Sequence, residues 1–201
     1  MLKITRKLGG IYLSLLLLMI LAGCAGEGKQ AKPQAIQRMR TDIFFEVKGE
    51  QPPPAGTVDL TIKASVKIPT REHFLLESRT PPPTEGGYPF ELNIGGQEIV
   101  WKVEGTLEKT PISDEKGRTP EGGEGIRYVL GKKIRLAPGA HHVVFGVPYD
   151  DYYTEVKVSL KEGEPHTLEF QPIYSTGRRG YETFHRGISR TRVLLDGVRI
   201  K

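Results

Sequence analysis

The sequence predicts an all-β fold, an antiparallel β-sandwich that follows an N-terminal signal peptide and a flexible tether. The 201 residues include 24 Gly and 15 Pro, which is typical of a chain with many turns. Apolar and polar residues alternate in residues 58–68, 99–103 and 156–160, as in strands with one buried face. The composition excludes collagen, a coiled coil and a polytopic membrane protein.

Residues 1–23 have the three parts of an export signal. Lys3, Arg6 and Lys7 make a charged start, and an uncharged apolar run occupies residues 11–22 before a small residue. We therefore expect residues 1–23 to be a signal peptide that is removed. Its loss lowers the net charge of the chain from +5 to +2.

The end of this leader, Leu21-Ala22-Gly23-Cys24, resembles the lipobox of bacterial lipoproteins. The resemblance implies cleavage before Cys24 and acylation of that cysteine, which anchors the protein to a membrane. Cys24 is also the only cysteine of the chain, so no disulfide can form within it. The competing interpretation is an uncleaved single-span helix, because residues 8–26 carry no charge.

Residues 24–39 are expected to hold the lipidated cysteine and a flexible tether. They are polar, lack aromatic side chains and show no sustained helical or strand period. A coil of this length lifts a folded domain about 20 Å from the lipid headgroups. We expect residues 40–201 to form a single β-sandwich domain beyond it.

The predicted strands follow one another at short intervals. Residues 43–47 form the first, and six apolar residues alternate with five polar ones in the second, residues 58–68. Gly95-Gly96 predicts a hairpin turn between strands at 88–94 and 97–107, with Trp101 in the core. Further strands are expected at residues 126–136, 140–147, 154–160 and 167–174.

Two other segments have a different character. Residues 109–125 are rich in Gly, Pro and charge, and they predict a long exposed loop. Residues 177–201 carry a net charge of +5, whereas residues 24–176 carry −3. This end predicts an exposed basic connection that includes Arg178 and Arg179, followed by a closing hairpin around Asp196-Gly197.

Residues 126–174 resemble the PEGA-type and related Ig-like surface modules of bacterial envelope proteins. The resemblance rests on Leu136-Ala137-Pro138-Gly139-Ala140, the Val-Val-Phe strand after it, an aromatic turn and residues 156–164. It implies a small antiparallel sandwich that displays or binds a partner and carries no chemistry. The sequence differs from the family at the motif itself, because it has Ala-Pro-Gly-Ala where the family motif is Pro-Glu-Gly-Ala.

No catalytic set or cofactor site can be assembled from the residues, so the sequence predicts that the protein is not an enzyme. No Gly-x-Ser-x-Gly motif or phosphate-binding loop is present. The histidines lack the spacing of metal ligands, and His141 and His142 would point to opposite faces of a sheet. We expect Asp150 and Asp151 to serve a turn.

The sequence thus predicts a lipid-anchored envelope lipoprotein with a structural or partner-binding role, on the periplasmic face of the outer membrane or the cell surface. The candidate binding residues are Tyr149, Tyr152, Tyr153, Arg178 and Arg179, with Tyr181 as a further aromatic residue. The expected partners are the membrane, an envelope protein, a polysaccharide or an anionic surface, and not nucleic acid. The competing interpretation of the basic end is a solvated charged segment that serves only solubility. The alternative is an envelope hydrolase or a protein that binds a small ligand or carbohydrate, which requires a deep polar pocket.

Overall fold

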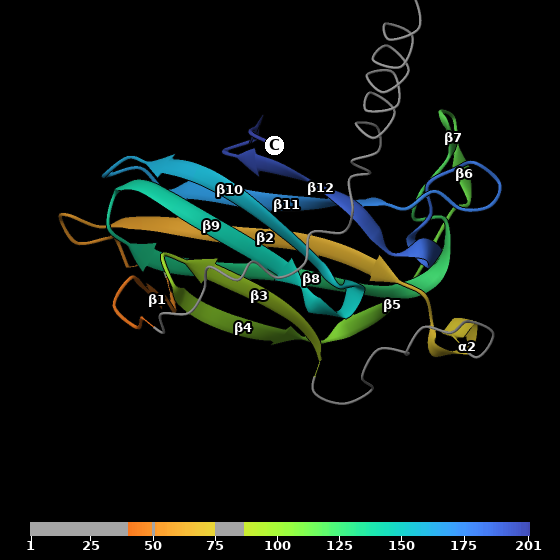
Figure 1. Cartoon of the computed structure of the whole chain (residues 1–201), viewed down its shortest axis with the longest axis horizontal. Coiled ribbons are helices and arrows are strands. Elements are labelled where there is room, and N and C mark those ends of the chain that lie inside the picture. The colour runs from red at the N-terminus through yellow and green to blue at the C-terminus, as the bar shows by residue number, and fades with distance from the viewer. Residues whose placement is uncertain (1–39, 50, 75–86) are drawn as a thin grey trace, which may run out of the picture.

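The computed structural model describes residues 40–49, 51–74 and 87–201, which form an all-β sandwich of two sheets (Figure 1). The predicted fold class is therefore confirmed. The signal peptide, Cys24 and the predicted tether lie outside the described residues. Helical structure in the described part is confined to one short helix, α2 (Arg71–Phe74), and two 3-10 turns, η2 (Pro148–Asp150) and η3 (Phe184–Arg186).

The larger sheet has seven strands. The strand order is β1 (Phe44–Glu46), β8 (Gly123–Leu136), β2 (Val58–Ile68), β11 (His166–Tyr174), β12 (Ile188–Leu195) and β13 (Val198–Arg199). The seventh strand, β5 (Gly105–Thr110), pairs with the first half of β8, on the same edge as β1, which pairs with the end of β8. All neighbours are antiparallel except β2 and β11, which are parallel with His166 opposite Leu60. This parallel contact brings together two strands about a hundred residues apart, which local patterns do not reveal.

The smaller sheet has the order β10 (Tyr152–Leu160), β9 (Gly139–Val147), β3 (Tyr88–Ile94) and β4 (Gln97–Val103). The predicted Gly95-Gly96 hairpin is confirmed, with Ile94 opposite Gln97. Both glycines have positive φ, 59° and 96°, as a two-residue hairpin turn of this type requires. Trp101 lies on β4 in the core as predicted, and its Nε1 donates to Glu46 Oε2 at 3.0 Å.

The core forms between the sheets, where the alternating apolar residues of each strand meet. Phe145 of β9 stacks on Phe170 of β11 with ring centroids 4.0 Å apart. Near one end of the sandwich, Tyr88 of β3 stacks on Tyr128 of β8 at 4.6 Å. These contacts between rings from different sheets define the packing of the two layers.

Residues 109–125 are not the irregular loop that the sequence predicts. β5 continues to Thr110, β6 (Ser113–Asp114) pairs with β7 (Gly117–Arg118), and β8 already begins at Gly123. The β6–β7 hairpin projects from the end of the sandwich (Figure 1). Period analysis misses it because these two-residue strands are exposed on both faces and carry no apolar alternation.

The predicted C-terminal hairpin is confirmed, although its first strand already begins at Ile188 and the connection before it is not exposed throughout, since Phe184 is buried. β12 and β13 form a hairpin around Asp196-Gly197, with Leu195 opposite Val198. The segment before β12 contains the exposed Arg178 and Arg179, followed by η3. Its backbone is joined to the segment before β8, because Phe184 N donates to Pro120 O at 2.9 Å.

Candidate functional site

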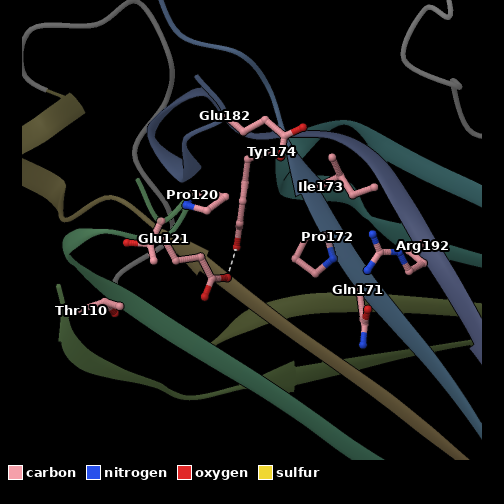
Figure 2. Close-up of a pocket in the computed structure, with 10 residues that line it drawn as sticks. Thr110, Pro120, Glu121, Gln171, Pro172, Ile173, Tyr174, Glu182 and Arg192 are labelled. Atoms are coloured by element: carbon pink, nitrogen blue, oxygen red, sulfur yellow. Dashed lines mark hydrogen bonds between the residues drawn. The ribbon is translucent and has the colours of Figure 1, made fainter. Parts of the chain in front are cut away.

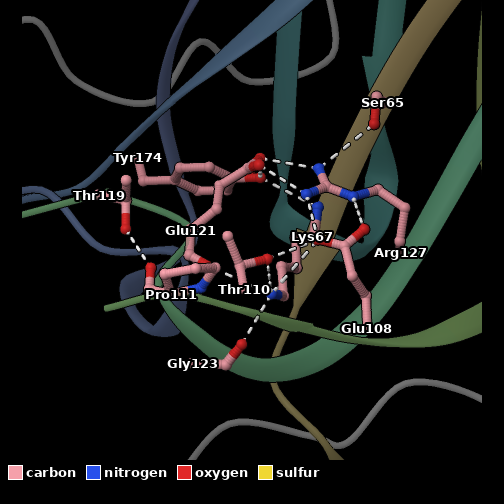
Figure 3. A network of polar contacts seen from close by, with 10 residues as sticks. All are labelled: Ser65, Lys67, Glu108, Thr110, Pro111, Thr119, Glu121, Gly123, Arg127 and Tyr174. Atoms are coloured by element: carbon pink, nitrogen blue, oxygen red, sulfur yellow. Dashed lines mark hydrogen bonds and ion pairs between the residues drawn. The ribbon is translucent and has the colours of Figure 1, made fainter. Parts of the chain in front are cut away.

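A buried lysine marks the end of the larger sheet where strands β2, β5, β8 and β11 meet. The alternation of residues along β2 places Lys67 on the outward face of the strand, yet its side chain is fully buried. Its Nζ donates to Thr110 Oγ1 at 2.8 Å and to the carbonyl oxygens of Glu121 and Gly123 at 2.9 and 2.8 Å (Figure 3). The ammonium therefore ties the start of β8 and the end of β5 to β2.

Arg127, which lies opposite Lys67 in the β2–β8 register, is held by two carboxylates. It donates to both oxygens of Glu108 at 2.9 Å, and to the two oxygens of Glu121 at 2.9 and 2.6 Å. Such paired hydrogen bonds fix a guanidinium in one orientation. They also hold the pKa of Arg127 above its ordinary value.

Tyr174 completes this group, which we call the Lys67 network: Lys67, Glu108, Thr110, Glu121, Arg127 and Tyr174. The Tyr174 hydroxyl donates to Glu121 Oε1 at 2.8 Å and accepts from the backbone N of Lys67 at 2.9 Å. Burial, reinforced by the negative charge of Glu121, raises the pKa of Tyr174. Two cations face two carboxylates, so the network balances its own charge.

Burial also lowers the pKa of Lys67, against the opposing effect of Glu108, whose Oε1 lies 3.6 Å from Nζ. The ammonium makes its three hydrogen bonds within the protein and lies 5.1 Å from the centroid of the Phe184 ring. These contacts leave no proton of Lys67 directed at a substrate. The geometry is therefore that of a clamp that holds the end of the sheet together, and not that of a general base or a nucleophile.

The Lys67 network predicts a loss of stability in acid. The hydrogen bonds from Arg127 and then Thr110 hold the pKa of Glu108 at about 2, below its ordinary 4.5. Because the folded pKa is the lower one, Glu108 stabilises the fold above about pH 4.5 and this contribution disappears as the pH falls toward 2. Thermal melts should show Tm of the wild type falling more steeply across this window than Tm of Glu108→Gln.

The matched control for this pH series is Glu115→Gln, in the exposed turn of the β6–β7 hairpin. Its acid profile should follow that of the wild type. Equal slopes for the wild type and Glu108→Gln would contradict the stabilising role of the Glu108 carboxylate.

A partly open pocket of about 340 Å³ lies beside the Lys67 network, against β11 and β12. Figure 2 shows its lining side chains. The walls are formed by Thr110, Thr119, Pro120, Glu121, Gln171, Pro172, Ile173, Tyr174, Glu182 and Arg192. The Tyr174 hydroxyl and Glu121 belong to both the wall and the network, so the clamp fixes one side of the pocket. We call this site the β11 pocket.

The predicted aromatic binding residues are not gathered around the β11 pocket. Tyr152 and Tyr153 begin β10 with exposed fractions of 6% and 7%, and Tyr149 is partly buried against the core beside Tyr88. These positions give the three side chains a packing role. Tyr181 is half-buried, and its ring lies 4.2 Å from the guanidinium carbon of Arg118 on β7.

The predicted basic residues do lie on the surface. Arg178 and Arg179 are exposed in the turn before Gly180. The backbone of this turn closes on itself, because Gly177 N donates to Tyr181 O and Gly180 N donates to Gly177 O. The two guanidinium groups are thus presented to solvent from an ordered turn.

His166, Asp196 and Asp150 make contacts of a structural kind. His166 Nδ1 lies 2.7 Å from Asp196 Oδ2, and Asp150 accepts a hydrogen bond from the Tyr88 hydroxyl at 2.8 Å. Within the described ranges, no three side chains of the metal-ligating types gather where they would hold an ion. No helix in that same part of the chain has the length and apolar character needed to cross a bilayer.

Fold and site together define a class: an all-β sandwich with a clamped sheet end and an adjoining pocket of ligand size. No family model, curated protein or solved structure matches the chain. Sequence reasoning missed the β11 pocket and its charged residues, because Glu121 lies in the segment that predicts a loop and Arg192 lies in the basic C-terminal segment. Only their position on the wall of one pocket distinguishes them from other surface charges.

Proposed function

We propose that the protein is a lipid-anchored lipoprotein of the bacterial cell envelope, whose β-sandwich has a non-catalytic, partner-binding role. The observation that carries this proposal is the leader that ends in Leu21-Ala22-Gly23-Cys24, with Cys24 as the only cysteine of the chain. A single exported thiol is explained by acylation. Two or three acyl chains give stable attachment where one chain is marginal.

Cys24→Ala is expected to release the protein from the membrane fraction. The wild type should incorporate radiolabelled palmitate and have a mass that lacks residues 1–23, whereas Cys24→Ala should incorporate none. Ala25→Ser, the adjacent control, should stay anchored and labelled. A wild-type protein that keeps residues 1–23 or takes up no palmitate would overturn the proposal in favour of a single-span helix.

An anionic surface is the partner that the charge distribution favours. Residues 177–201 carry a net charge of +5, and Arg178 and Arg179 are exposed. Anionic lipid headgroups, lipopolysaccharide or an acidic envelope protein would complement this end of the domain. The position after Cys24 is Ala25 and not Asp, which favours the outer membrane over retention in the inner one.

Replacing Arg178, Arg179 and Arg186 with Ser is expected to weaken binding of the delipidated domain to anionic vesicles by roughly tenfold or more at low salt. Tm should change little, since all three arginines are exposed. The control replaces three exposed lysines of the other sheet or its connecting turn with Ser: Lys102, Lys157 and Lys161. If both triple variants bind the vesicles equally, the weaker binding reflects the lower net charge of the domain, and the surface that carries Arg178 and Arg179 is not the binding site.

Binding of a small ligand is the second candidate function. The β11 pocket favours it, since about 340 Å³ lies within the range of roughly 300–1,000 Å³ of small-molecule sites. A hydrolase is less well supported, because the carboxylate of Glu121 is already engaged by Arg127 and Tyr174. The two candidates are compatible, as an anchored domain can also carry a ligand.

A further inference from the structure

The β11 pocket contains two charged side chains whose charges nothing in the described structure neutralises. Arg192 lies on β12 opposite Gln171 of β11, and Glu182 lies in the segment that leads to η3. Among the described residues, neither the Arg192 guanidinium nor the Glu182 carboxylate takes part in an ion pair or a hydrogen bond. Figure 2 shows Glu182 near Tyr174, and Arg192 beside Gln171 and Pro172.

The other polar groups of the pocket are already engaged. Glu121 accepts from Arg127 and Tyr174, and Thr110 Oγ1 accepts from Lys67 and donates to Glu108. The Thr119 hydroxyl donates to Pro111 O, and the Gln171 amide donates through Nε2 to Glu169 Oε1 at 2.9 Å. One cation and one anion therefore remain for a ligand, at different places on the wall.

The rest of the wall is apolar. Pro172 and Ile173 of β11 lie along the pocket, and Pro120 faces them from the segment before β8. The Tyr174 ring does not present a face, because only 3% of the residue is exposed. An apolar surface without an open aromatic ring suits an aliphatic side chain better than a sugar ring, which aromatic side chains usually stack against.

We propose that the β11 pocket binds a small zwitterion, a free amino acid or a dipeptide with aliphatic side chains. Its ammonium group lies at Glu182, its carboxylate lies at Arg192, and its side chain packs on Ile173 and the two prolines. A carboxylate only accepts hydrogen bonds and a guanidinium only donates them, so the two ends of the ligand are distinguished. This inference deepens the ligand-binding candidate and is independent of the lipid anchor.

The test is isothermal titration calorimetry of the full chain in detergent micelles at low ionic strength. The probes are L-alanyl-L-alanine, its N-acetyl derivative and its C-terminal amide. The unmodified dipeptide should bind, and loss of either terminal charge should weaken binding about fivefold, the upper value for a solvent-exposed ion pair. Absence of binding by the dipeptide, or equal binding of all three probes, would overturn the proposal.

Variants assign each end of the ligand. Glu182→Gln should abolish the preference for the free amine over the N-acetyl form, while Arg192→Gln should abolish the preference for the carboxylate over the amide. Arg190→Gln removes the same charge from the same strand, outside the pocket lining, and should keep both preferences. If each variant loses both preferences equally, the assignment of the two ends is wrong. Because the assay does not depend on acylation, its failure is distinct from failure of the Cys24 test.

Discussion

Phe170→Ala is expected to lower the free energy of unfolding of the domain by about 3–5 kcal/mol, the range for truncation of a buried phenylalanine. Phe170 on β11 is 2% exposed and belongs to the hydrophobic core. Its ring is 4.0 Å from that of Phe145 on the opposite sheet, at an interplanar angle of 9°. Truncation removes this stack and leaves a cavity between the two layers, which the rigid strands cannot close.

Chemical denaturation provides the measurement, with the free energy of unfolding extrapolated to water. Phe45→Ala is the matched control, since Phe45 on β1 is 58% exposed and buries far less surface. It should change the free energy of unfolding by about 0.5 kcal/mol or less. Similar losses for the two variants would mean that the sheets do not pack through Phe170.

Lys67→Met is expected to lower the free energy of unfolding by about 3 kcal/mol. This loss is expected although methionine is close to lysine in length and is more apolar. The substitution leaves three buried acceptors, Thr110 Oγ1 and the carbonyl oxygens of Glu121 and Gly123, without their donor. It also leaves one negative charge of the network unbalanced. Because Glu108 is partly exposed, water relieves some of this charge, which keeps the expected loss below that of a fully dry ion pair.

Lys63→Met tests whether the loss of stability in Lys67→Met comes from removing a lysine charge from β2 or from the buried contacts of Lys67. Lys63 lies on the same outward face of β2, four residues earlier, and is exposed. The same substitution there should change stability by about 0.5 kcal/mol or less. Hydrogen exchange should show greater exposure of amides near Gly123 in Lys67→Met alone. A neutral Lys67→Met would show that the clamp is not needed to hold the start of β8.

Local chemistry explains why much of the fold is predictable. Alternation at residues 58–68 places Val58, Leu60 and Ile62 on one face, and only burial of that face makes the pattern favourable. Gly95-Gly96 predicts its hairpin because a two-residue turn of this type needs positive φ. The closing hairpin at Asp196-Gly197 follows from the same argument, as each signal lies within a few neighbouring residues.

The Lys67 network and the β11 pocket could not be predicted, because their residues come from distant parts of the chain. Lys67 occupies one of the polar positions of its strand, so the pattern predicts a solvated side chain. The groups that enclose it, Thr110, residues 121–123 and Phe184, come more than forty positions later in the chain. Tyr149, Tyr152 and Tyr153 flank the predicted turn at Asp150-Asp151 and are candidate binding residues by sequence. In the structure Tyr152 and Tyr153 are buried, and Tyr149 is partly buried against the core. Burial at such positions depends on long-range contacts that no local period encodes.

By itself, the sequence determined the all-β class, the strands with alternating faces and the tight glycine turns, because each depends on the conformational preferences and burial pattern of a short segment. The tertiary structure alone decided the parallel contact of β2 with β11, the clamp around Lys67 and the placement of Glu182 and Arg192 on the wall of one pocket. These features join residues from distant parts of the chain. Their energies arise only when the two sheets and the segments at their ends have come together.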